Sequence, residues 1–320
     1  MKFRTELAIE PSPIRIDHDS AILTIGSCFS DEIGSRLRSR LFNVMPNPFG
    51  TLFNPASIKR LIKDVAEGKT YNSTDIFLGN EGAFHSYLHH SKFSSDDEST
   101  ILTSINSIHE QVRKFLSHEN LIVVLTLGSA RAFRHIESGH IVANCHKQPS
   151  KEFETIDLSI NDIVDELRTT TEMIQGINGN ARFLLTVSPV RHVAYGLHAD
   201  RLSKSKLLVA ADIVASDMAD KVGYFPAYEL IVDDLRDYRF YSDDLVHPSS
   251  MGADYVYEHF ESTFMDKSEI EYCRLCLKLH KLLNHRPIIE TESSRENRRR
   301  QIDELKSRLA AVYPSILETL

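Results

Sequence analysis

The chain reads LIVVLTLG at residues 121–128, an apolar run of strand length that ends in glycine. Such a run predicts a strand that is buried on both faces of a sheet. Two further runs have the same character, AILTIG at 21–26 and RFLLTV at 182–187. Segments with apolar residues at helical spacing separate them, and we expect helices at 31–41, 56–67, 99–116, 160–174, 205–221 and 250–264. A short edge strand is expected at 224–226.

This alternation of strands and helices decides the fold class. Strands joined by helices of ten or more residues imply right-handed crossovers and a mainly parallel sheet with helices on both faces. We therefore predict a three-layer α/β sandwich over residues 1–265. Residues 266–320 are more charged and predict a helical C-terminal extension, which is either an accessory bundle or a partner-binding helix pair. Its apolar residues at helical spacing are Leu305, Leu309, Val312 and Ile316.

The composition excludes several classes of protein. The 320 residues carry a formal net charge of -8, which argues against nucleic-acid binding because that affinity comes from clustered Lys and Arg. The basic run at 295–300 has acidic neighbours and is typical of a solvated helix face. No signal-peptide core and no membrane-length apolar run occurs. We expect a cytoplasmic protein without a nucleic-acid or membrane partner; the oligomeric state is left open.

Cysteine usage indicates free thiols. Cys28, Cys145, Cys273 and Cys276 occur in a chain without an export signal, so we expect reduced side chains. The C-x-x-C at Cys273 and Cys276 could bind zinc or act in redox chemistry, but no second ligand pair accompanies it, and its apolar neighbours favour the packing face of a helix. A phosphate-binding or dinucleotide-binding glycine motif is also missing. We expect neither a metal nor a cofactor.

Four polar clusters fall where the predicted strands end. They are Gly26-Ser27-Cys28, Gly128-Ser129, Ser188-Pro189-Val190-Arg191-His192 and Asp244-Leu245-Val246-His247, the last just before a predicted helix. Ligands of open parallel sheets bind outside the carboxyl ends of the strands. We therefore expect these clusters to form one site.

The residue types in these clusters suit nucleophilic catalysis. A cysteine at a helix N-terminus has its thiolate stabilised by unpaired N–H groups and the helix dipole. His247 would act as the base that activates Cys28, and Asp244 would fix the imidazole tautomer. Glycine-flanked turns at Cys28 and Gly50 can donate N–H groups to an oxyanion. Each signal alone is weak, since a G-S-C tripeptide is usually a simple turn and a histidine often caps a helix.

Several spaced motifs resemble one family. They are KFRT at 2–5, IGSCFS at 25–30, NPFG at 47–50 with NP at 54–55, TLGSA at 126–130, NCHK at 144–147, SPVRH at 188–192, LRDYRFY at 235–241 and DLVHP at 244–248. Over roughly residues 1–265 the chain resembles the GSCFA family, named for its Gly-Ser-Cys-Phe-Ala signature and related to SGNH/GDSL hydrolases. The resemblance implies an SGNH hydrolase-like, flavodoxin-like α/β fold and a site, but no substrate.

The resemblance also implies roles for particular residues. Cys28 stands at the position of the superfamily's nucleophilic serine, and Ser27 stands where aspartate is usual. We favour Cys28 over Ser27 as the nucleophile, with Ser27 as the alternative. Asp244 and His247 match the superfamily's acid and base. Gly50 matches the second-block glycine that donates its N–H.

The third block departs from the superfamily pattern. The usual Gly-x-Asn is Gly128-Ser129-Ala130 here, so the asparagine donor of the oxyanion hole is missing and ordinary GDSL esterase activity is in doubt. Asn144, with His146 beside it, is the candidate replacement from another loop, although a structural turn is an equal interpretation. Gly128 and His146 are further candidates for binding the oxyanion or the substrate. Other polar candidates for lining the pocket are His85, Arg191 and His192.

These observations predict acyl transfer through a Cys28 thioester. Water or an acceptor hydroxyl would resolve the acyl-enzyme, so ester hydrolase and acyltransferase are both open for a small-molecule or carbohydrate acyl ester. The rival is a catalytically degenerate domain that binds a carbohydrate or acyl ligand; the missing third-block asparagine favours it, and the Asp244/His247 pair favours the enzyme. In a third hypothesis the C-terminal helices contact a protein partner.

Overall fold

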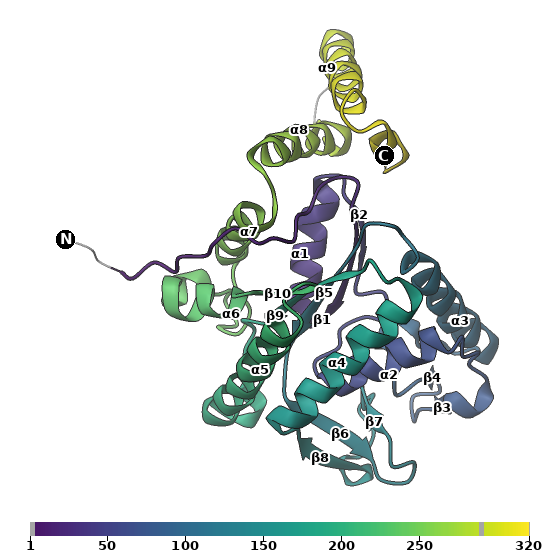
Figure 1. Ribbon diagram of the computed structural model, residues 1–320. Coiled ribbons are helices and arrows are strands. Elements are labelled where there is room, and N and C mark those ends of the chain that lie inside the picture. The colour runs from purple at the N-terminus through teal and green to yellow at the C-terminus, as the bar shows by residue number, and fades with distance from the viewer. Residues whose placement is uncertain (1–3, 288–290, 320) are drawn as a thin grey trace.

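A parallel five-stranded sheet forms the centre of the protein, with strand order β10-β9-β5-β1-β2 (Figure 1). The computed structural model describes residues 4–287 and 291–319, so Lys2 and Phe3 of the first sequence motif lie outside it. The strands are β1 Ala21–Gly26, β2 Asn43–Pro46, β5 Leu121–Leu127, β9 Arg182–Val187 and β10 Val222–Phe225. Counting only these strands gives the order 2-1-3-4-5 of flavodoxin-like doubly wound sheets. The predicted α/β fold is confirmed.

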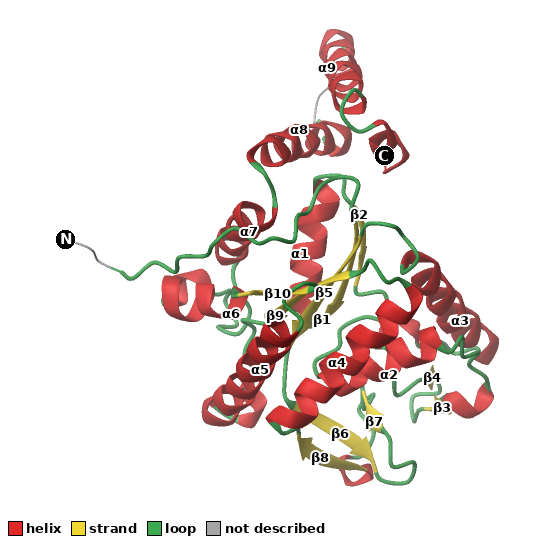
Figure 2. Cartoon of the chain, viewed as in Figure 1, coloured by secondary structure: helices red, strands yellow, loops and turns green. Residues whose placement is uncertain are grey.

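Helices cover both faces of this sheet and complete three layers (Figure 2). One face carries α2 Pro55–Ala66, α3 Glu98–Phe115, α4 Ile160–Ile177 and α5 Leu197–Asp217. The other face carries α1 Cys28–Ser39 and α7 Ser250–Phe264, with α6 Ala227–Glu229 and a π-helical turn Leu230–Leu235 beside them.

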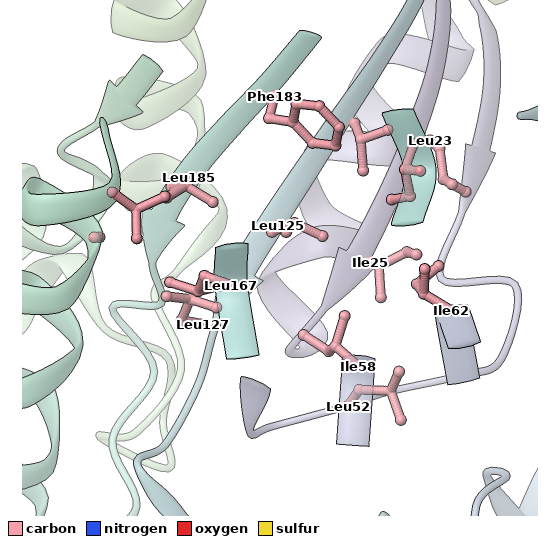
Figure 3. Close-up of a cluster of buried hydrophobic side chains, with 14 of the residues drawn as sticks. Leu23, Ile25, Leu52, Ile58, Ile62, Leu125, Leu127, Leu167, Phe183 and Leu185 are labelled. Atoms are coloured by element: carbon pink, nitrogen blue, oxygen red, sulfur yellow. The ribbon is translucent and has the colours of Figure 1, made fainter. Parts of the chain in front are cut away.

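Side-chain alternation along the strands builds a core on each face. Leu23 and Ile25 of β1 pack in the cluster that contains Ile58 and Ile62 of α2, which Figure 3 shows together with Leu125 and Leu127 of β5. Ile22 points to the opposite face and joins Phe29 of α1. A strand with apolar side chains on both faces therefore packs in two cores, which explains the nearly continuous apolar runs in the sequence.

Most element boundaries match the sequence prediction, with three informative differences. Helix α1 begins at Cys28 rather than residue 31, because Ser27 caps it. Strand β2 was not predicted, because Pro46 and Pro48 are residues typical of turns. Helix α5 begins at Leu197, eight residues before the predicted start at 205.

Two small sheets lie outside the central one and were also missed. The first is the hairpin of β3 Phe77–Leu78 and β4 Phe84–His85. The second follows β5 and contains β6 Arg131–His135, β7 Ile141–Val142 and β8 Phe153–Asp157. Short 3-10 helices occur at 73–75, 91–93, 150–152, 193–195, 238–240 and 314–319. Both sheets lie towards the carboxyl ends of the central strands (Figure 2).

The C-terminal extension consists of α8 Lys267–Asn284 and α9 Glu292–Ala310. Their predicted apolar residues are mostly used within the chain: Leu305, Leu309 and Ile316 are buried with Leu41, whereas Val312 is 60% exposed. Both cysteines of the C-x-x-C are buried in α8, in agreement with the predicted packing face. No described helix is long and apolar enough to cross a membrane.

A buried polar contact fastens this extension to the α/β layers. The His18 imidazole uses Nδ1 to contact the Glu269 carboxylate of α8 and Nε2 to contact the backbone oxygen of Arg40 at 2.7 Å. The Tyr313 hydroxyl donates to the other Glu269 oxygen at 2.8 Å. Segments from both ends of the chain therefore meet at Glu269.

The turn that leads from β1 into α1 requires glycine at position 26. Gly26 has φ +145°, and a Cβ atom there would lie 2.1 Å from the Thr126 backbone oxygen of the neighbouring strand. We expect Gly26→Ala to lower the free energy of unfolding by roughly 3 kcal/mol, from strain and overpacking together. Urea denaturation measures this. The control is Gly139→Ala, since Gly139 also has positive φ but open space around it; equal losses in both variants would contradict the close-approach argument.

Candidate active site

A cavity of about 480 Å³ lies at the carboxyl ends of the strands. Cys28 and His247 line it, together with Asn144, Arg191 and His192. The start of α1, the loops after β7 and β9, and the turn before α7 supply these side chains. The structure thus brings most of the clusters that the sequence singled out to one place.

Cys28 is the first residue of α1 and is half-buried in the wall of this cavity. Burial raises the pKa of its thiol, and the nearby Asp31 carboxylate raises it further, whereas the N–H groups of Cys28 and Phe29 and the Lys204 ammonium lower it. The raising effects are larger. The expectation that the helix N-terminus yields a reactive thiolate is therefore corrected: desolvation outweighs the helix terminus.

Ser27 is buried and does not line the cavity. Its hydroxyl oxygen caps α1 by accepting a hydrogen bond from the Phe29 N–H at 3.3 Å. Of the two candidate nucleophiles, only Cys28 has its side chain in the cavity wall.

Asp244 and His247 form a hydrogen-bonded pair. The Asp244 Oδ2 atom lies 2.7 Å from His247 Nδ1, and Oδ1 accepts N–H groups of Val246 and His247. Hydrogen bonds from the His247 backbone and ring, and then from the Val246 N–H, lower the pKa of Asp244 to about 2. Both side chains are about half exposed. The Nε2 atom of the His247 ring remains available, and within the described part of the chain this ring makes no hydrogen bond to Cys28.

The two glycines expected to serve the oxyanion do not offer free N–H groups. The Gly50 N–H donates to the Asn47 backbone oxygen at 2.8 Å, and the Gly128 N–H donates to the Phe53 backbone oxygen at 2.9 Å. Gly50 has another role: a Cβ at this φ of +82° would lie 2.2 Å from His90 Cβ. It therefore lets the chain pass close to His90, which lines the cavity.

Asn144 lines the cavity, but its neighbour His146 does not. The Asn144 Oδ1 atom accepts the His146 N–H at 2.8 Å, so the amide nitrogen is the part left for a ligand. The His146 ring is buried and its Nε2 faces the backbone oxygens of Ser86 and His89. His85 is likewise engaged, with Ser94 and Glu81. Both histidines hold the loop that carries His90 rather than line the cavity.

Lys204 is a buried cation beneath the site that the sequence analysis missed. Its Nζ donates to the backbone oxygens of Gly128, at 2.6 Å, and Ser188, at 2.8 Å. Burial lowers its pKa to about 8, while Asp200 and Cys28 act in the opposite direction. The available signal was a lysine on the apolar stripe of α5 with Leu207 and Ala211; the predicted helix began one residue too late to include it.

Asn47 joins the loop after β2 to the Cys28 turn. Its Oδ1 accepts the Gly26 N–H at 2.9 Å, and its Nδ2 donates to the Ser27 backbone oxygen and to Asp31. The NPFG motif had been noted without a role for this side chain. Its contacts fix the position of the turn that carries Cys28.

One group of potential metal ligands occurs in the described part of the chain, and it lies away from the cavity. His18, Glu269 and Cys273 have ligand atoms within 4.8 Å of one another. However, both His18 ring nitrogens already face oxygen acceptors, on Glu269 and Arg40. The contacts suit a buried His–Glu pair better than a metal centre.

The fold and cavity define a doubly wound α/β protein with its candidate site at the carboxyl edge of the sheet. More specifically, the chain belongs to the GSCFA family, whose model matches residues 21–260. The predicted family resemblance is therefore confirmed. A comparison with curated protein sequences finds no match.

Solved structures with a similar arrangement are distant. A carbohydrate esterase family 3 protein from Talaromyces cellulolyticus has a TM-score of 0.35 and 11% identity, covering 80% of this chain and 97% of that one. A candidate GDSL-like lipase from Parabacteroides merdae has a TM-score of 0.37 and 12% identity, covering 79% and 98%. A DUF4886 family protein from Bacteroides uniformis has a TM-score of 0.36 and 11% identity, covering 92% and 96%.

The electrostatic effect of Lys204 on Cys28 can be measured directly. We expect Lys204→Met to move the pH midpoint of Cys28 alkylation upward, because a buried cation that lowers the pKa of the thiol is lost. Iodoacetamide labelling across pH, with peptide mass spectrometry, gives this midpoint. Lys206→Met is the matched control, since the Lys206 ammonium of the same helix binds the Leu158 backbone oxygen instead. An unchanged midpoint in folded Lys204→Met, checked by circular dichroism, would show that the ammonium does not act on Cys28.

Proposed function

We propose that this protein is an ester-acting hydrolase or acyltransferase that works through Cys28. The observation that carries the proposal is the presence of Cys28 and His247 on the wall of one cavity, with Asp244 hydrogen-bonded to the His247 ring. A nucleophile, a base and a group that orients the base are the parts that acyl transfer requires.

In the proposed mechanism the resting thiol is protonated, since burial raises its pKa. His247 Nε2 takes the thiol proton as sulfur attacks the carbonyl carbon, and the Asp244 carboxylate holds the opposite ring nitrogen. Collapse of the tetrahedral intermediate expels the alcohol, which takes the proton from His247. Water or a second hydroxyl then attacks the thioester by the same steps in reverse order.

The oxyanion needs donors other than Gly50 and Gly128. The Thr51 residue lines the cavity, and its backbone N–H has no partner within the described residues. The amide nitrogen of Asn144 can approach from the loop after β7. We propose that these groups, with the N–H of Cys28, replace the missing third-block asparagine.

The second candidate is a binding domain without turnover. Two observations favour it: the raised pKa of the Cys28 thiol and the lack, among described residues, of a hydrogen bond from that thiol to His247. Catalytic hydrogen bonds are often long before substrate arrives, so the second observation does not exclude the enzyme.

The nucleophile is tested by comparing Cys28→Ala with Ser27→Ala. We expect Cys28→Ala to abolish hydrolysis of short p-nitrophenyl esters, because the attacking sulfur is gone. Ser27→Ala should retain turnover and lose only about 1 kcal/mol of stability, the usual value of a helix N-cap. Activity in Cys28→Ala together with inactivity in Ser27→Ala would move the nucleophile to Ser27. No ester hydrolysis by the wild-type protein would favour the binding domain.

The base is tested with His247→Ala. We expect kcat/KM to fall by about 10²–10⁴-fold, the usual contribution of a positioned general base. Cys145 provides an internal reference for chemical labelling, since it lines the same cavity and burial raises its pKa to about 11. The His247→Ala change should slow alkylation of Cys28 relative to Cys145. If the ratio of the Cys28 labelling rate to the Cys145 labelling rate is the same in the wild type and in His247→Ala, His247 has no part in the mechanism.

A further inference from the structure

A second cavity of about 420 Å³ adjoins the candidate active site. Arg191 lines both cavities, so it forms a wall that they share. Arg201 and Arg236 also line the second cavity, opposed by two aspartates, Asp233 and Asp237. Two sequence motifs that the proposed mechanism leaves unused, SPVRH at 188–192 and LRDYRFY at 235–241, meet here.

Arg191 is held in place by aromatic side chains rather than by a carboxylate. Its guanidinium carbon lies 5.2 Å from the ring centroid of Tyr238 and 4.4 Å from that of Tyr241. Its Nη atoms donate to the two phenol oxygens, at 3.3 Å and 3.1 Å respectively. The Arg191 N–H also donates to the Val246 backbone oxygen, next to His247. The cation is therefore oriented, but its charge is not neutralised by these partners.

The other two arginines also lack an acidic partner. The Arg201 guanidinium donates to the Tyr228 hydroxyl, and within residues 4–287 and 291–319 neither Arg191, Arg201 nor Arg236 forms an ion pair. Asp237 is neutralised by Arg239 at 2.9 Å. Among the residues that line the cavity, Asp233 is thus the one unpaired acid, and it faces three arginines. The cavity therefore carries an excess of positive charge, although the net charge of the chain is -8.

We propose that this arginine-lined cavity is a subsite for an oxyanion, a carboxylate or a phosphate group, on the substrate that Cys28 attacks. The guanidinium group presents a planar fork of donors that matches both groups. With the anion bound by Arg191, Arg201 and Arg236, the ester carbonyl would extend past Arg191 towards Cys28. That the bound molecule is a substrate rests on the proposed function. Anion binding itself does not depend on catalysis.

The test measures anion binding to the full chain by isothermal titration calorimetry. The probes are inorganic phosphate and succinate, at low ionic strength because salt screens exposed charges. We expect saturable binding of at least one anion, with a Kd on the order of 1 mM or lower. Phosphate binding alone indicates a phosphate-bearing substrate, and succinate binding alone indicates a carboxylate-bearing one.

Variants locate the binding site. Arg191→Gln and Arg236→Gln should each weaken binding by at least about tenfold, as expected for loss of a charged hydrogen-bond donor. Arg191→Lys should recover only part of the affinity, since the charge returns without the fork. The matched control is Arg134→Gln, because this arginine is paired with Glu154 and does not line the cavity. Arg236 is exposed, so its variant keeps the test valid if Arg191→Gln misfolds.

Two results would overturn the proposal: neither anion binds saturably, or binding is unchanged in both Arg191→Gln and Arg236→Gln. Cys28→Ala separates this inference from the proposed reaction, since it should bind the anion as the wild type does. If ester hydrolysis fails in every assay but arginine-dependent binding persists, the reaction is wrong and the anion subsite stands.

Discussion

The buried ammonium of Lys204 joins the carboxyl ends of the two central strands β5 and β9. Its hydrogen bonds to the backbone oxygens of Gly128 and Ser188 fix the points from which two loops depart. The first loop places Ser129 and the second places Arg191 in the cavity wall. A buried charge is costly unless it is satisfied, and Asp200, one turn earlier on α5, supplies the opposite charge. The geometry of the site therefore depends on one cation that no substrate needs to touch.

The layered fold was predictable because its signal is local. Unbroken apolar runs mark β1, β5 and β9, since each packs against helices on two faces. Strand β2 was missed because Pro46 indicated a turn, although an edge strand tolerates a proline. The strands at 131–157 are short and partly exposed, so their sequences lack a clear alternating pattern.

The candidate site was predictable in outline because loops at the carboxyl edge of a parallel sheet must converge. That rule predicted that Cys28, Arg191 and His247 would meet, and all three line one cavity. It could not assign the N–H groups of Gly50 and Gly128, because residue type does not reveal which backbone oxygen accepts a given N–H. It also could not find Lys204, since burial of a lysine is decided by tertiary packing.

The half-buried thiol of Cys28 has a consequence for the chemistry of oxidation. Peroxide attacks the thiolate and converts it to sulfenic acid, whereas the neutral thiol reacts slowly. Because burial raises the pKa of Cys28, most molecules at rest hold the unreactive form. In the proposed mechanism the thiol is deprotonated only when a base and a substrate meet it, so it would survive oxidative stress that inactivates a permanently ionised cysteine.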